Sequence, residues 1–102
     1  MPNYTLVNAE TRANNHPSSF LIPNRPRRER VVPGYHVKLI FENGRDGERM
    51  WVLVTGMAKI DEAITFTGVL HNDPVQLEGV KYGDAVRFGP EHIADIQVGT
   101  DG

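Results

Sequence analysis

Apolar residues recur at every second position along much of the chain after residue 30, a pattern that predicts β-strands. It predicts one strand over 35–42 and another over 48–57, joined by the stretch "ENGRDGE", which is typical of a hairpin loop. The second of these, "ERMWVLVTGM", is apolar on both faces, as expected of a central strand. Residues 64–72 alternate as well, and Gly68 within them predicts a bulge or a sharp bend.

Shorter elements complete this part of the chain. We expect a polar connection over 58–63, a short strand over 75–77 and another strand over 85–88. The stretch "GPEHI" (89–93) predicts one helical turn, because proline is well suited to the first position of a helix. A last short strand over 93–98 follows. These elements predict a mainly β (α+β) fold, either a small, strongly bent antiparallel sheet or an SH3-like barrel.

The first 30 residues differ from the rest, because they show little periodicity and contain four of the seven prolines. One short helix is expected over 7–14. The apolar residues 20–22 lie between prolines, which excludes a central strand or a long helix there and favours an irregular, extended strap. The sequence therefore predicts a single domain in which a helix and strap (1–30) pack on a β-rich body (31–102).

Charge is distributed unevenly between these two parts. Residues 1–30 carry five basic and two acidic side chains, whereas residues 31–102 carry six basic and eleven acidic ones. A basic arm of this kind either binds an acidic partner or folds onto the protein's own carboxylates, and we favour the second. The alternative is nucleic-acid binding through the arginines of "NRPRRER", which could contact phosphates. These are Arg25, Arg27, Arg28 and Arg30.

Several function classes are disfavoured by the sequence. Cysteine is absent, which excludes disulfides, thiolate zinc sites and thiol nucleophiles. The N-terminus lacks the pattern of a secretory signal, and no apolar run is long enough for a membrane span, so we expect a cytoplasmic protein without membrane contact. The stretch "HNDP" (71–74) is typical of a turn rather than of a metal site. We therefore expect no metal, no cofactor and no catalytic residues, and we favour a non-enzymatic chain over an enzyme.

Trp51, the only tryptophan, belongs either to the core or to a binding surface. Strand alternation places Met50, Val52 and Val54 on one face and Trp51 on the other. A buried core role is the simpler expectation for so large a side chain in a small domain. If the first face fills the barrel, however, Trp51 lies outside and needs either the strap at 20–22 or a partner to cover it.

The surface around Trp51 is our candidate binding site, because a strand edge with aromatic and arginine side chains suits protein recognition. A second possibility is a small-molecule or nucleotide-binding pocket that uses Arg49, His71, Asp73 and His92. The candidate protein-binding residues are Glu48, Arg49, Trp51, His71, Asn72, Asp73, Tyr82 and Asp84.

A family resemblance adds to this interpretation. The chain carries, in order, Glu48-Arg49-Met50-Trp51-Val52, then Gly68 with Leu70, Asn72 and Pro74, then Gly83-Asp84 with Val86 and Phe88, and lastly Glu91 and Ile93. This pattern, over about residues 31–96, resembles the domain of unknown function 2314 family of small uncharacterised bacterial proteins and related immunity-protein-like domains found beside polymorphic toxin genes.

The resemblance implies a compact β-rich domain with a short N-terminal helix, and it carries over no catalytic residues. It favours an interaction or immunity-type role over catalysis. We therefore expect a non-enzymatic protein-binding module, such as an immunity protein or a component of a bacterial or phage defence system. The partner is expected to be another protein, and the oligomeric state is left open.

Overall fold

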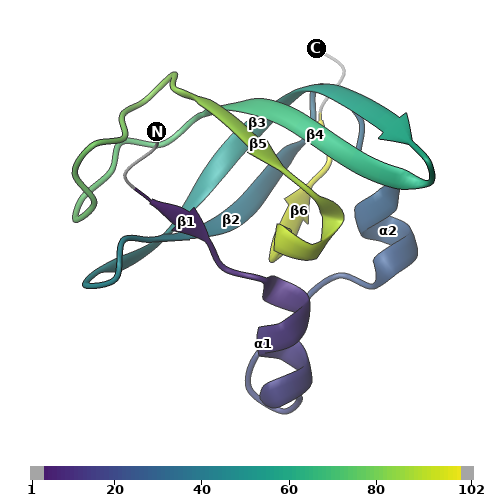
Figure 1. The fold of residues 1–102 in the computed structure, drawn as a ribbon, viewed down its shortest axis with the longest axis horizontal. Coiled ribbons are helices and arrows are strands. Elements are labelled where there is room, and N and C mark those ends of the chain that lie inside the picture. The colour runs from purple at the N-terminus through teal and green to yellow at the C-terminus, as the bar shows by residue number, and fades with distance from the viewer. Residues whose placement is uncertain (1–3, 100–102) are drawn as a thin grey trace.

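The computed structural model describes residues 4–99 and shows a curled sheet with two short helices at one end (Figure 1). The elements in chain order are β1 (Thr5–Leu6), α1 (Ala9–Asn15), α2 (Arg25–Glu29), β2 (His36–Glu42), β3 (Gly47–Ile60), β4 (Ala63–Leu70), β5 (Ala85–Phe88), the 3-10 turn η1 (Pro90–His92) and β6 (Asp95–Gln97).

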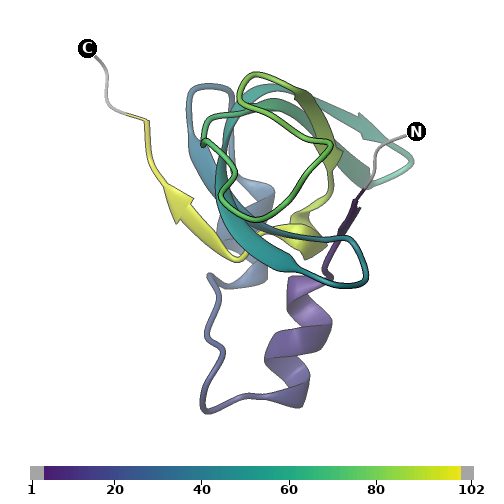
Figure 2. The ribbon, with the colours of Figure 1, turned by 90° about the vertical axis from the view of Figure 1, so that its left-hand side faces the viewer.

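All strands belong to one antiparallel sheet. The order is β1-β2-β3-β4-β5, and β6 pairs with the part of β2 that β1 leaves free. Seen from the side, the strands curl around a common core and form a half-barrel; α1 extends below it, and α2 lies behind the strands (Figure 2). The mainly β fold and the bent antiparallel sheet expected from the alternation pattern are confirmed.

The sheet curls because β3 and β4 approach each other very closely at one point. Their register shifts between Val54 and Gly56, which marks a β-bulge, and Gly68 of β4 lies directly opposite Val54. A Cβ atom at Gly68 would lie only 2.5 Å from the carbonyl oxygen of Leu53. The bulge at this glycine increases the local bend, so the irregularity predicted at Gly68 is confirmed.

The core fills the concave side of the half-barrel and follows the predicted alternation. On β2 and β3, every second side chain points into the core, and the residues between them face outward, although one of these, Ile40, is also buried at 3% exposure. Residues that follow β4 and β5 close the ends of the core. The buried cluster consists of Val31, Val37, Leu39, Phe41, Met50, Val52, Val54, Phe66, Leu70, Leu77, Val80, Val86, Phe88 and Ile93.

Two predicted boundaries in the body are wrong. Residues 58–60 continue β3 rather than starting a polar connection, and the chain reverses at Asp61 and Glu62 with φ values of 50° and 69°. Such a two-residue turn usually contains asparagine or glycine, and neither residue type marks this position. The short strand predicted over 75–77 is also wrong, because the backbone N–H groups of these residues bind the Glu48 carboxylate instead of a neighbouring strand.

The N-terminal third contains the predicted helix, α1, as well as two elements that the sequence interpretation missed. One is β1, a pair of residues on the edge of β2. The other is α2, which begins after Asn24, whose side chain accepts a hydrogen bond from the N–H of Arg27. Pro26 lies in the first turn of α2, where proline is tolerated, so this proline did not exclude a short helix.

Arg28 of α2 connects the N-terminal third to the body. Its side chain is only 5% exposed, and Nη1 lies 2.6 Å from the Glu10 carboxylate of α1. The same nitrogen donates to the carbonyl oxygen of Pro90 in η1, while Nε donates to that of Pro23. A buried guanidinium thus has partners in three segments, as a buried charge requires.

Among residues 4–99, neither helix has the length and hydrophobicity of a membrane-spanning segment.

We predict that Gly68→Ala destabilises the protein by about 2 kcal/mol, because the added methyl group would overlap the backbone of β3. Gly47→Ala is the matched control, since a Cβ atom there would lie 3.7 Å from the nearest atom, in ordinary contact. Urea denaturation of both variants measures the difference. Equal stability of the two variants would show that the close approach at Gly68 is not required for the fold.

Candidate protein-binding surface

Trp51 lies on the outer face of the sheet, as the alternation of β3 predicts. Met50 and Val52 are fully buried on the concave side, whereas Trp51 between them is only partly buried. Lys38 of β2 is its cross-strand partner, and the Lys38 ammonium lies 4.8 Å from the centroid of the indole ring. This is a cation–π contact on a solvent-facing surface.

Three more rings lie beside this pair. His36 stacks on His71 with 4.8 Å between ring centroids, and His71 contacts Tyr82 at 5.2 Å. Tyr82 is 51% exposed, and His71 is exposed as well. Since His36 and Lys38 alternate on the same face of β2, all these side chains belong to one surface. We name it the outer-face cluster: His36, Lys38, Trp51, His71 and Tyr82.

The two histidines are electrostatically coupled. Nε2 of His36 lies 2.8 Å from Nδ1 of His71, so one nitrogen donates its N–H to the other. In this geometry only one of the two facing nitrogens carries a hydrogen atom. Partial burial, and then the neighbouring His71, lower the pKa of His36 below its ordinary value.

Glu48 holds the loop that presents His71 and Tyr82. Its carboxylate accepts hydrogen bonds from three successive backbone N–H groups, those of Val75, Gln76 and Leu77, at 2.7 to 3.1 Å. Burial opposes ionisation of Glu48, but these three donors outweigh it and keep the pKa of the carboxyl below its ordinary value. The carboxylate therefore stabilises the loop at neutral pH, and this contribution disappears only in acid.

Two further side chains fix the same loop. Oδ1 of Asn72 accepts the backbone N–H of Trp51 at 2.9 Å, which joins the start of the loop to β3. At its other end, the Asp84 carboxylate accepts the N–H of Lys81 and closes the turn before β5. Leu77 and Val80 anchor the middle of the loop in the core. The loop between β4 and β5 is therefore held at both ends and in its middle.

The strap covers the surface next to Trp51. The guanidinium of Arg49 lies over the ring of Phe20, 5.5 Å from the ring centroid, and the guanidinium of Arg12 lies over the same ring. A shallow cavity of about 350 Å³ separates the strap from Lys38 and Arg49. Phe20 of the strap thus contacts the Arg49 side chain, which stays exposed, while Lys38 covers part of the indole of Trp51.

The eight candidate residues consequently fall into different roles. Trp51, His71 and Tyr82 come together on the outer face, and the exposed Arg49 lies over Phe20 of the strap. Three other candidates use their polar atoms to hold the loop between β4 and β5. Asp73 is exposed at the start of this loop. The three holding residues are Glu48, Asn72 and Asp84.

Sequence reasoning missed His36 and Lys38. The signal was present, because both alternate with the apolar residues of β2 and must face away from the core. A hairpin register through the "ENGRDGE" loop places Lys38 directly opposite Trp51. The strand prediction was therefore sufficient to find them.

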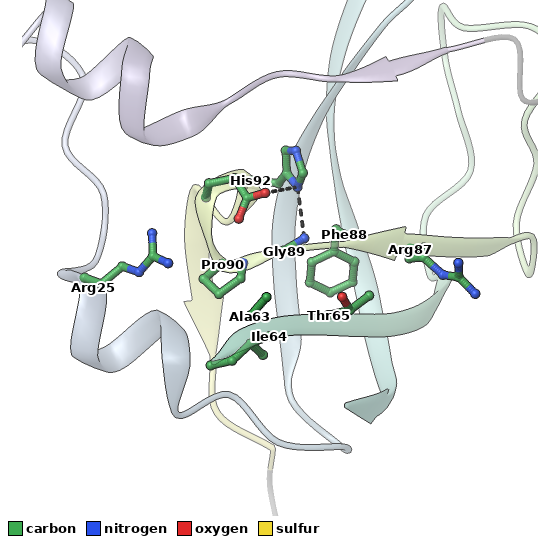
Figure 3. Close-up of a pocket in the computed structure, with 10 residues that line it drawn as sticks. Arg25, Ala63, Ile64, Thr65, Arg87, Phe88, Gly89, Pro90 and His92 are labelled. Atoms are coloured by element: carbon green, nitrogen blue, oxygen red, sulfur yellow. Dashed lines mark hydrogen bonds and ion pairs between the residues drawn. The ribbon is translucent and has the colours of Figure 1, made fainter. Parts of the chain in front are cut away.

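The four residues of the alternative pocket do not share one place in the structure. His71 belongs to the outer-face cluster and Arg49 lies at the strap, whereas His92 lines a cavity of about 380 Å³ beside β5 and η1 (Figure 3). Nδ1 of His92 accepts the backbone N–H of Gly89 at 3.0 Å, and the Glu91 carboxylate, 3.8 Å away, is beyond hydrogen-bond distance. His92 therefore stabilises the turn after β5.

The basic stretch of the strap is partly neutralised within the N-terminal third. Arg25 pairs with Glu10 at 2.6 Å and with Glu29 at 2.8 Å, and Arg28 pairs with Glu10 as described above. The partners are acids of the same N-terminal third rather than of the acidic body. Arg27 and Arg30 are exposed.

We predict that Glu48→Ala destabilises the protein by about 2 kcal/mol, because three N–H groups lose a charged acceptor. Glu48→Gln is the matched control and should lose less, since its amide oxygen still accepts. Amide hydrogen exchange at residues 75–77 should accelerate in the alanine variant. Unchanged exchange there would contradict the role assigned to this carboxylate.

We predict that the stability of the protein falls as the pH is lowered from 7.5 to 5.5. The pKa of His36 is lower in the folded state, so the unfolded chain takes up a proton first and is favoured as the pH drops below about 6.5. Urea denaturation at both pH values should show a smaller loss for His36→Gln than for the wild type. An identical loss would rule out His36 as a source of the pH dependence.

Comparison with known proteins identifies the family of this chain. Residues 3–102 match a family described as "Uncharacterized protein conserved in bacteria (DUF2314)". No curated protein and no solved structure shows significant similarity to the chain. The match extends over the strap, the half-barrel and the loop that carries the outer-face cluster. The chain therefore belongs to the DUF2314 family.

Proposed function

We propose that this chain is a non-enzymatic protein-binding module whose contact surface is the outer-face cluster. The observation that carries the proposal is the position of Trp51, which a core role would place inside the half-barrel but which lies on its outer face. Tryptophan and tyrosine are the residues that most often dominate binding energy at protein interfaces. Here both are on one surface, with Lys38 beside the indole.

The scaffold around the cluster favours binding. The loop that carries His71 and Tyr82 is held by the carboxylate of Glu48, by Asn72 and by the turn at Asp84. Trp51 and Lys38 lie on paired strands of the sheet. A surface that is already ordered loses little conformational entropy on association, so more of the contact energy appears as affinity.

The composition of the cluster indicates the chemistry of its partner. Flat aromatic rings favour an apolar contact in the centre, and Lys38 and the histidine pair favour acidic groups around it. An interaction of this kind fits an immunity-type or defence-related role in a bacterial cytoplasm, as the family resemblance suggests. The specific partner would then be a protein with an acidic rim around an apolar site.

Nucleic-acid binding through the strap is less well supported. Arg25 and Arg28 are bound to carboxylates, which leaves Arg27 and Arg30 as the arginines of the stretch that form no ion pair with the described residues. Two cations contribute little to phosphate binding, whose affinity depends on the number of charges neutralised.

We predict that Trp51→Ser and Lys38→Glu each weaken partner binding by roughly tenfold or more, because both residues lie at the centre of the cluster. Proteins retained from host extract by the immobilised wild-type chain are identified by mass spectrometry. Each is then produced in pure form and titrated by calorimetry against the wild type and the variants.

The matched control is Ile60→Ser, which removes a 70% exposed apolar side chain nine positions further along β3, roughly 30 Å away along the strand. Circular dichroism checks that each variant is folded. The proposal fails if every purified partner binds the folded Trp51 and Lys38 variants as tightly as the wild type.

A further inference from the structure

The half-barrel is open between β1 and β5. Five strands alternate in direction from β1 to β5, so β1 and β5 lie at the two ends of the sheet and run the same way. A groove of about 580 Å³ separates them and has the size of a typical ligand site. The residues that line it are Tyr4, Thr5, Leu6, Ala85, Arg87 and His92. We name it the seam groove.

Both walls of the seam groove present free backbone groups. In an antiparallel sheet, successive residues bond alternately to one neighbour and to the other. The N–H of Leu70 bonds to the carbonyl of Asp84, so Val86 and Phe88 continue the bonding to β4, and the backbone groups of Ala85 and Arg87 point away from it.

The same alternation applies to the other wall. The N–H of Val7 bonds to the carbonyl of Ile40, so Thr5 also bonds to β2, and the backbone groups of Leu6 point into the seam groove. One strand running opposite to both walls would bond to each of them. Together with the five strands from β1 to β5, it would complete an all-antiparallel barrel. Direct pairing of β1 with β5 cannot do so, because these two strands run the same way.

The side chains of the groove indicate what such a strand must carry. Tyr4 and Leu6 are half-buried and pack against the core, and the Tyr4 ring contacts Phe41 edge-on at 4.9 Å. Inward-facing residues of the strand would therefore be apolar. Arg87 is exposed on the outer face of β5, between Val86 and Phe88, which point to the core. Outward-facing residues beside it would be acidic.

His92 adds a second donor at the end of the groove. Because its Nδ1 accepts the N–H of Gly89, the neutral ring carries its proton on Nε2. The ring extends from η1 toward β1 (Figure 3). Arg87 supplies the positive charge of the groove, His92 adds a neutral N–H donor, and the described residues that line the groove include no carboxylate.

We propose that the seam groove binds an extended segment of a partner protein in which apolar and acidic residues alternate. The segment enters as a β-strand antiparallel to both β1 and β5. Its backbone supplies affinity through bonds to the two free edges, and its acidic side chains face Arg87 and His92. This site involves other strand edges and residues than the outer-face cluster, and it would exist whether or not that cluster binds a protein.

The test is selection from a phage-displayed library of random linear seven-residue peptides on the immobilised wild-type chain. We expect enrichment of alternating apolar and acidic residues. A synthetic peptide of the enriched sequence should bind Arg87→Glu roughly tenfold more weakly, because its acids then meet a like charge. Arg30→Glu is the matched control, since it makes the same charge change at an exposed arginine outside the groove.

Hydrogen exchange distinguishes strand addition from binding elsewhere. The peptide should slow exchange of the Leu6, Ala85 and Arg87 amides, and Trp51→Ser should leave its affinity unchanged. The proposal is overturned if no alternating sequence is enriched, if Arg87→Glu and Arg30→Glu bind equally, or if the protected amides lie in β3. Occupation of the groove by a second copy of the chain, seen as a dimer that protects the same amides without peptide, would also overturn it.

Discussion

The close approach of β4 to β3 at Gly68 is the constraint on which the rest of the structure depends. A side chain there would collide with the carbonyl of Leu53, so only glycine lets the two strands meet at the bulge. The bend gives the sheet a concave side for a continuous core and a convex side that water reaches. Without this bend, a sheet so short could not enclose Phe41, Phe66 and their neighbours from several directions.

The bend also decides which polar side chains are structural. Glu48 of β3, which strand alternation places on the same face as Met50 and Val52, holds the loop between β4 and β5 with one carboxylate on three N–H groups. Arg28 holds the N-terminal third in place in a similar way, because it binds Glu10 and two carbonyl groups. Charged residues with such full sets of partners are poor candidates for a binding site, because their bonds already satisfy them.

Much of this organisation was visible in the sequence. Alternation correctly separated Met50 and Val52 from Trp51, and it placed the irregularity at Gly68, since both follow from local backbone geometry. The role of Glu48 was not predictable, because its partners lie 27 to 29 residues away in the chain. The turn at Asp61 and Glu62 was missed for a different reason: the two residues adopt left-handed conformations that their types rarely take.

The two proposed surfaces rest on different physical features of the same sheet. The outer-face cluster depends on side chains, since its strands are fully paired and only rings and cations remain to make contacts. The seam groove depends on backbone groups, because the five strands from β1 to β5 alternate in direction and so leave β1 and β5 running the same way. Exposed strand edges often pair with other chains and aggregate. Here β1 is only two residues long and β5 only four, and Arg87 of β5 places a charge at the edge. A short charged edge admits a matching segment more readily than it joins a copy of itself.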